Sequence, residues 1–388
     1  MINKPLNIPT LTPLRGIAAL MVAIFHFDAV VANFVNPQQS MLIAKCYLMV
    51  DLFFIMSGFI MMHVYGDKFS AAINKADLLK FIGARFARVY PLHFFTLLIW
   101  VALFYALNQP PSPITNPMAI PTHVLLLHSF GIHNIFTWNV PSWSISAEWW
   151  AYIIFPLLVL FLARFKNIAV IILSIFSLVA YIAIMYYLPR VNLFVPNLPA
   201  PHNLDVTYNY GYLRGFAGFI AGMICYLLFK QQQIINFLRR DIISFTIIFI
   251  TILLFHFGVN DLMIIPIFML LVINIAANQG ALYKTFQFKP LQYLGEISYS
   301  IYLVHGFVMF YFAIPIIEKL GYVYKQGPGS LRLSFITGLG YCTLYVLLVI
   351  LLSTISFYTI EKPCRDWLNK KFKKVKSIST ENLQPSLS

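Results

Sequence analysis

Long apolar stretches recur along the whole sequence and decide what the chain can fold into. Hydrophobic residues make up 60% of the 388 residues and charged residues only 10%, whereas soluble domains carry about 25% charged residues. Several stretches reach the ~20 residues that a helix needs to cross the hydrocarbon core of a bilayer. The chain is therefore predicted to be an all-α integral membrane protein.

About ten transmembrane helices are expected, because backbone amides in lipid must be hydrogen-bonded within their own segment. The stretch 122–136 is too short to cross and is expected to be interfacial or re-entrant. On this interpretation residues 1–365 form one membrane domain, and residues 366–388 form a basic and polar cytoplasmic tail. The approximate spans are 11–33, 41–65, 88–108, 143–163, 168–188, 210–229, 241–257, 261–277, 291–318 and 333–359.

The positions of the basic residues indicate the orientation. The net charge is +14, which on a soluble protein would suggest that it binds nucleic acid. Cytoplasmic loops of membrane proteins collect Lys and Arg, and here these residues gather in 68–88, 230–240 and 362–376, whereas 109–142 contains none. We therefore expect 109–142 outside, both termini in the cytoplasm and no nucleic-acid partner.

The four cysteines are scattered without the spacing of a disulfide framework or a zinc site. They are Cys46, Cys225, Cys342 and Cys364. We expect them to be small packing residues, and we expect no metal.

The first span carries two ionisable residues, Arg15 and His26. Eleven residues at ~100° each amount to three turns plus about 20°, so both side chains share one helix face and lie about 16 Å apart along the axis. Ionisable groups within spans are costly and are functional candidates by default. The spacing fits a site for a long substrate, in which Arg15 binds the anionic head and His26 is a base above it. It fits equally well a snorkelling arginine and a structural histidine.

Three further groups of polar residues lie in or beside spans. Asp51 is expected to lie about 15 Å deep in the second span, where it needs a partner such as Arg or His. Arg85 and Arg88 are three apart on one face and suit phosphate oxygens, although taken alone such a pair is more often ordinary loop charge. Glu361 ends the last span and could pair with a loop arginine.

The fourth and ninth spans carry candidates at a depth similar to that of His26. Ser144 and Glu148 are neighbours one helical turn apart. Ser298, Tyr302 and His305 follow a helical stripe. Polar groups at one depth on three helices predict a single shared site.

These segments, in this order, resemble the acyltransferase-3 family of membrane acyltransferases over about residues 10–365. Each motif alone is weak, but six in order are specific. The motifs are Arg15 with His26, Asp51-Leu52-Phe53-Phe54 with Ser57-Gly58-Phe59, Arg85-x-x-Arg88, Ser142-Trp143-Ser144-Ile145-Ser146-Ala147-Glu148, Gly295-Glu296-Ile297-Ser298-Tyr299 through His305, and Glu361-Lys362-Pro363.

The resemblance implies an O-acyltransferase of the bacterial inner (cytoplasmic) membrane. Such an enzyme moves an acyl group, usually acetyl, from cytoplasmic acetyl-CoA to a hydroxyl of an extracytoplasmic polysaccharide or glycan such as O-antigen or exopolysaccharide. On this hypothesis His26 is the general base or a transient acyl carrier, Glu148 orients it, and three arginines hold the donor phosphates: Arg15, Arg85 and Arg88. Four residues shape the site or bind the acceptor: Asp51, Ser144, Tyr302 and His305.

A proton-coupled transporter or flippase of a glycan or lipid-linked sugar is the alternative. It would use His26, Asp51 and Glu148 as a proton relay. The lack of a visible internal repeat and the inner arginine pair speak against it. The sequence leaves open the acceptor, the acyl group, the need for a partner protein and the oligomeric state.

Overall fold

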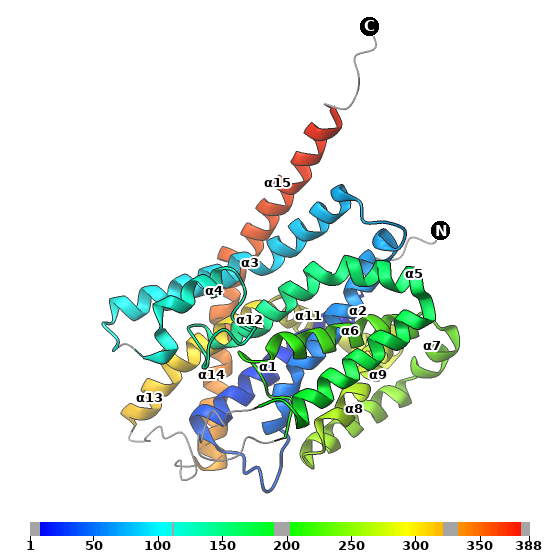
Figure 1. Cartoon of the computed structure of the whole chain (residues 1–388). Helices are drawn as coiled ribbons and strands as arrows, with labels where there is room; N and C mark the ends of the chain where they lie inside the picture. Colours follow the sequence, from blue (N-terminus) through cyan, green and yellow to red (C-terminus); the bar gives the residue numbers. More distant parts are fainter. Residues whose placement is uncertain (1–7, 111, 190–201, 321–332, 382–388) are drawn as a thin grey trace.

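A computed structural model describes residues 8–110, 112–189, 202–320 and 333–381, and every regular element within these ranges is a helix. Seven of these helical segments are long and apolar enough to cross a membrane. They are Leu11–Ala32, Ala44–Phe69, Lys75–Ala106, Val140–Tyr186, Gly211–Phe229, Ser298–Lys319 and Phe335–Phe372. Figure 1 shows them gathered into one bundle.

The helices of the first half are α1 (Leu11–Phe27), η1 (Asp28–Ala32), η2 (Ala44–Leu48), α2 (Met49–Phe69), α3 (Lys75–Ala106), η3 (Pro113–Thr115), η4 (Pro117–Ala119), α4 (Ile120–Val124), η5 (Val140–Ser142) and α5 (Trp143–Tyr186). Those of the second half are α6 (Gly211–Phe229), α7 (Gln232–Leu238), α8 (Asp241–His256), α9 (Asp261–Ala277), α10 (Ala281–Phe286), α11 (Lys289–Glu296), α12 (Ser298–Val308), η6 (Met309–Ala313), α13 (Ile314–Lys319), α14 (Phe335–Ser356), η7 (Phe357–Glu361) and α15 (Lys362–Glu381).

Helix α5 covers two of the predicted spans, 143–163 and 168–188. Its helical conformation is interrupted at Lys166, where φ is 45° and ψ is −119°. The chain folds back there, so that α5 has two arms (Figure 1). The expected inner loop between these spans is thus reduced to a sharp bend.

Helices α8 and α9 correspond to the two short predicted spans. They have 16 and 17 residues and are joined by a turn in which Gly258 has a positive φ of 63°. Segment 122–136 forms the short helix α4 and turns, in line with the expectation that it does not cross.

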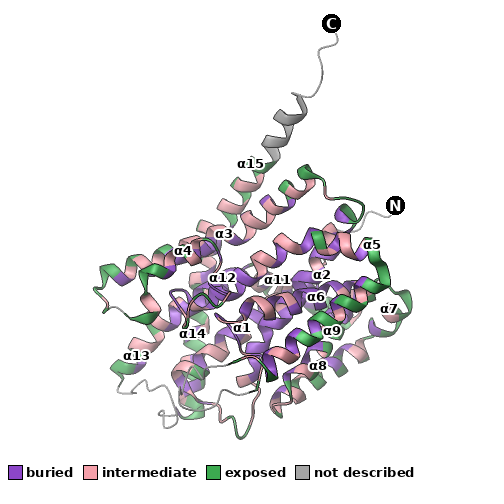
Figure 2. Ribbon diagram, in the orientation of Figure 1, coloured by how far each residue is buried: buried purple, intermediate pink, exposed green. Residues whose placement is uncertain are grey.

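The centre of the bundle depends on close helix contact between α2 and α6. A Cβ atom on Gly58 would lie 1.9 Å from the carbonyl oxygen of Phe219, and one on Gly222 would lie 2.0 Å from that of Ile55. Glycine is therefore required at both positions, as small residues are at tight membrane-helix interfaces. Figure 2 shows that buried residues concentrate in the central helices, including α1, α2, α6 and α12.

The basic end of the chain continues the last span as helix α15. This helix projects from the bundle beside the first half of α3 (Figure 1), and a Cβ atom on Gly83 of α3 would lie 2.9 Å from the Phe372 ring. The predicted boundary at residue 365 falls inside α15, and residues 382–388 of the predicted tail lie outside the described ranges. The predicted tail is therefore helical as far as Glu381.

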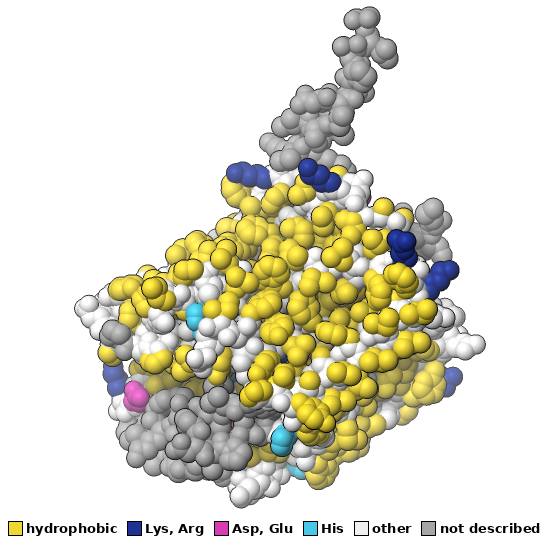
Figure 3. All heavy atoms as spheres, viewed as in Figure 1, with side chains coloured by type: hydrophobic (Ala, Val, Ile, Leu, Met, Phe, Trp, Pro, Cys, Tyr) yellow, Lys and Arg dark blue, Asp and Glu magenta, His cyan; other side chains and the backbone are white. Residues whose placement is uncertain are grey.

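The outer surface of the bundle is apolar. Figure 3 shows hydrophobic side chains over most of the visible face, with Lys and Arg near the base of α15 and at the edges. A continuous apolar surface of this kind suits contact with lipid tails rather than with water.

Candidate active site

A cavity of about 100 Å³ lies between α1, α2, α3, α5 and α12. It brings together six of the residues selected from the sequence. These are Arg15, Arg85, Arg88, Ser144, Glu148 and Tyr302. Ser144, Glu148 and Tyr302 share this cavity, whereas His26 and His305, which the sequence placed in the same site, do not line it. The cavity volume is below the ~300–1,000 Å³ of pockets that enclose a whole ligand of moderate size.

Two of the arginines present uncommitted donors to the cavity. Arg15 makes no hydrogen bond or ion pair with the described residues. Arg85 lies between two aromatic rings, with its guanidinium carbon 5.5 Å from the centroid of Tyr65 and 5.7 Å from that of Tyr152. Its buried Nε has no partner among the described residues. Desolvated guanidinium groups without a carboxylate partner form a site for an anion.

Arg88 differs from the other two arginines because it is already paired. It forms an ion pair with Glu361, which also accepts a hydrogen bond of 2.7 Å from Ser300. Arg365 approaches the same carboxylate at 3.5 Å. The expected pairing of Glu361 with a loop arginine is confirmed, and the pair joins η7 to α3 beside the cavity.

Glu148 lies in the cavity but not against His26. Its Oε1 accepts hydrogen bonds from Ser57 at 2.8 Å and from Tyr152 at 2.6 Å. In the described part of the chain, the group that bonds the Nδ1 of His26 is the carbonyl of Val22. The sequence predicted that Glu148 orients His26, and the contact needed for that role is not formed. Similar depth on two helices does not make side chains meet when the helices are rotated differently about their axes.

A hydrogen bond joins two of the helices that line the cavity. Ser144 Oγ donates to Tyr302 Oη at 2.8 Å, which joins α5 to α12. One turn further along α12, the ring of His305 has its centroid 5.7 Å from that of Tyr302. His305 itself does not line the cavity.

His26 and His305 meet beyond Tyr302. Their ring centroids are 5.0 Å apart, as expected from their similar predicted depth. His305 is fully buried, whereas His26 is partly exposed. The arginines and Tyr302 line the cavity, and the ring contacts of Tyr302 with His305 and of His305 with His26 continue this series of groups, called the path below, to the two imidazoles.

Asp51 has the basic partner that its depth demanded, but it does not line the cavity. Its carboxylate binds Arg214 of α6, with Nη2 2.6 Å from Oδ2, and both side chains are fully buried. Arg214 also donates to the carbonyl groups of Tyr47 and Val206. Arg214 was not among the residues selected from the sequence, although an arginine inside a predicted span was a sufficient signal.

Three histidines of the 109–142 region and α3 form a stack that the sequence did not predict. The ring centroids of His123 and His128 are 3.9 Å apart, and that of His93 is 5.7 Å from His128, with nearly parallel planes. All three Nδ1 atoms are buried without a hydrogen-bond partner among the described residues. Within the described ranges, no group of three or more His, Cys, Asp or Glu side chains is arranged to hold a metal ion.

The stack predicts that acid destabilises the packing of the 109–142 segment. Burial, followed by the neighbouring His93, lowers the pKa of His128 to about 3, and burial lowers that of His123. Because the unfolded chain binds these protons more readily, stability is complete above the unfolded pKa of about 6.5 and falls as pH decreases below it. His128 should cost about 2 kcal/mol of stability between about pH 7 and pH 5. Thermal unfolding of His128→Gln should depend less steeply on pH than that of the wild type, and an equal dependence would contradict the assignment.

Comparisons with known proteins agree on one family. A family model described as an acyltransferase domain matches residues 10–361. No solved structure matches the chain.

Three relatives illustrate the similarity. The O-acetyltransferase OatA of Staphylococcus aureus is 27% identical over 93% of this chain and 58% of its own length. The acyltransferase MdmB of Streptomyces mycarofaciens is 31% identical over 40% of each chain. A Rhizobium radiobacter protein named "Protein 2 in picA locus" is 39% identical over 29% of this chain and 56% of its own length. The chain thus matches at most about three fifths of the length of these relatives.

Proposed function

Because the chain belongs to the acyltransferase-3 family, we propose that it is a membrane O-acyltransferase that carries an acetyl group from cytoplasmic acetyl-CoA to a hydroxyl of a glycan outside the membrane. Two relatives are named as an acyltransferase and an O-acetyltransferase. The observation that carries the proposal is the line of groups from three arginines, through Glu148 and Tyr302, to a pair of histidines.

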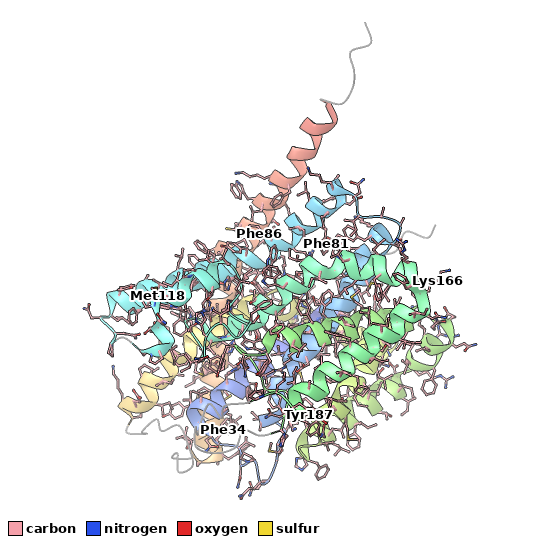
Figure 4. The ribbon with its side chains drawn as sticks, in the orientation of Figure 1. Phe34, Phe81, Phe86, Met118, Lys166 and Tyr187 are labelled. Atoms are coloured by element: carbon pink, nitrogen blue, oxygen red, sulfur yellow. The ribbon has the colours of Figure 1, made fainter. Side chains whose placement is uncertain are left out.

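The proposed topology has ten crossings with both termini in the cytoplasm. The two arms of α5 and the short helices α8 and α9 supply the crossings beyond the long helices. Phe81 and Lys166, from segments assigned to the inner side, lie toward one end of the molecule, whereas Phe34 and Tyr187 lie toward the other (Figure 4). This arrangement agrees with the distribution of basic residues.

The arginines would bind the phosphates of the donor at the inner mouth. Guanidinium forks match phosphate oxygens, and the charge of Arg15 and Arg85 is not neutralised by an ion pair with a described residue. The cavity is too small for the whole donor, so the nucleotide would lie at the mouth and the pantetheine arm would extend toward Tyr302. Glu148 would be a positioning residue that holds Ser57 and Tyr152 as part of the cavity wall.

The transfer step needs one base. His26 Nε2 takes the proton of the acceptor hydroxyl while the oxygen of that hydroxyl attacks the thioester carbonyl carbon. The C–S bond then breaks, and the thiolate takes the proton back from His26. An imidazole is suited to both transfers near neutral pH. A fixed tautomer contributes to this role, since the bond from Nδ1 to Val22 leaves the lone pair on Nε2.

The test of this function is acyl transfer by the purified protein. Radiolabelled acetyl-CoA is supplied with membranes from cells that lack the protein, and alkali-labile label in the glycan fraction is measured. The proposal expects label that depends on the protein. Proton-dependent glycan transport with no ester formed would replace the proposal with the transporter alternative.

Arg85 provides the clearest prediction for donor binding, since Arg88 has a structural partner in Glu361. Arg85→Ala should raise the KM for acetyl-CoA by about tenfold or more, the loss expected for a hydrogen bond to a charged group. Arg85→Lys should recover only part of the lost affinity for acetyl-CoA, because an ammonium group lacks the planar fork of a guanidinium group. Arg164→Ala, at an exposed position before the bend of α5, is the matched control. An unchanged KM for Arg85→Ala would refute the anion site.

A further inference from the structure

The two imidazoles at the outer end of the path have the same fixed tautomer. His26 Nδ1 lies 2.9 Å from the carbonyl oxygen of Val22, and His305 Nδ1 lies 2.7 Å from that of Tyr302. A carbonyl oxygen can only accept a hydrogen bond, so each Nδ1 carries the hydrogen. Each neutral ring therefore has its lone pair on Nε2.

Both Nε2 atoms lack a donor from the protein. His305 Nε2 is buried and has no partner in the described part of the chain, and His26 Nε2 has none there either. A buried acceptor without a partner costs about 1–3 kcal/mol and is rare in folded proteins. The Nε2 of His305 is such an acceptor, and the ring of the partly exposed His26 lies beside it, so the pair marks a place where a ligand can supply the missing hydrogen bond.

The packing around the pair fixes its geometry. The ring of Phe27, next to His26, stacks on that of Tyr345 of α14 with centroids 4.8 Å apart, and the Tyr345 hydroxyl donates to the carbonyl of His305 at 3.1 Å. The backbones that carry both imidazoles are thus connected through one tyrosine. The distance between the two imidazoles is therefore set by the packing of α1, α12 and α14.

We propose that His305 binds a second hydroxyl of the acceptor, next to the hydroxyl that His26 deprotonates, so that the acceptor presents two adjacent hydroxyls as a sugar ring does. This inference rests on the proposed acyl transfer and specifies its acceptor class. One hydroxyl has a single hydrogen and satisfies one of the two Nε2 atoms. A vicinal diol satisfies both, and in the transfer step only the proton given to His26 moves.

Two substitutions separate acceptor binding from a structural role. In His305→Asn the side-chain amide can still donate to the Tyr302 carbonyl, but no atom reaches the position of Nε2. In His305→Gln the longer side chain can place its carbonyl oxygen near that position. A purely structural role predicts no such difference in acceptor preference.

The assay compares trans-1,2-cyclohexanediol with cyclohexanol as acceptors at equal concentration, using purified protein in nanodiscs and labelled acetyl-CoA. The wild type should form the diol ester about tenfold faster than the cyclohexanol ester, the effect of about one hydrogen bond. His305→Asn should bring this ratio close to one, and His305→Gln should restore part of it. Acetyl-CoA binding by each variant shows that it is folded.

The outcomes distinguish this inference from the function on which it rests. A wild-type ratio near one, or a His305→Asn variant that keeps the wild-type ratio, overturns the inference. Ester formed on native membranes with neither alcohol acylated overturns it as well. An absence of ester on native membranes contradicts the proposed function itself.

Discussion

Replacing His26 with alanine is expected to lower the rate of acyl transfer by a factor of about 10² to 10⁴, the usual contribution of a positioned general base. Acetyl-CoA binding should persist, because Arg15, Arg85 and Arg88 line a cavity that His26 does not line. The expected pattern is therefore a large loss in kcat with little change in donor affinity. Single-turnover rates and equilibrium binding of labelled acetyl-CoA measure the two quantities separately.

The matched control for this loss is His256→Ala. His256 ends α8 and hydrogen-bonds Ser40 at 3.0 Å, outside the candidate site. Turnover of this variant should resemble that of the wild type. Wild-type turnover in His26→Ala would remove His26 from the mechanism. Label that remains on wild-type protein when the acceptor is omitted would favour an acyl carrier over a base.

Breaking the ion pair between Asp51 and Arg214 is expected to give the largest loss of stability. Both side chains are fully buried, so Asp51→Ala leaves a buried guanidinium group whose remaining acidic partner is Asp205, 3.7 Å from Arg214 Nη1 with a side chain that is 31% exposed. The removal of one partner of such a pair typically costs 3–5 kcal/mol. Thermal unfolding of purified protein in detergent, followed by intrinsic fluorescence, measures the loss.

A double variant shows whether the charge itself is the cause. Asp51→Leu combined with Arg214→Met replaces the pair with apolar groups and should recover most of the stability lost in Asp51→Ala. The exposed pair of Lys230 and Asp67, at 4.0 Å with side chains 48% and 76% exposed, is the surface control. Asp67→Asn should change stability by less than about 1 kcal/mol. A double variant as unstable as Asp51→Ala would show that packing, and not the uncompensated charge, is responsible.

Much of the helical layout could be predicted because the bilayer imposes length and apolar composition on each crossing helix. The spans at 11–33 and 210–229 agree closely with helical segments at Leu11–Ala32 and Gly211–Phe229. The interruption at Lys166 also lies between the predicted spans 143–163 and 168–188. The described structure shows seven apolar helices of sufficient length, and the count of ten remains part of the proposal.

The candidate site was only partly predictable, because depth along a helix does not give its rotation. His26 and His305 share a depth and meet, whereas Glu148 turns toward Ser57 and Tyr152. The bond from His26 to the carbonyl four residues earlier is local and could have been anticipated from helix geometry. Arg214 was missed because counts of loop charge treat basic residues as topological signals rather than as partners of buried acids. The histidine stack depends on how the 109–142 segment folds against α3, which periodicity does not reveal.

We propose above that the protein acylates a surface glycan and that His26 is the base in this transfer. Mass spectrometry of surface glycans from cells that lack the protein, complemented with the wild type or with His26→Ala at equal expression, tests it most directly. The account predicts an alkali-labile acetyl increment with the wild type and its loss with His26→Ala. Identical glycan masses with and without the wild-type protein, or an undiminished increment with His26→Ala, would contradict the account.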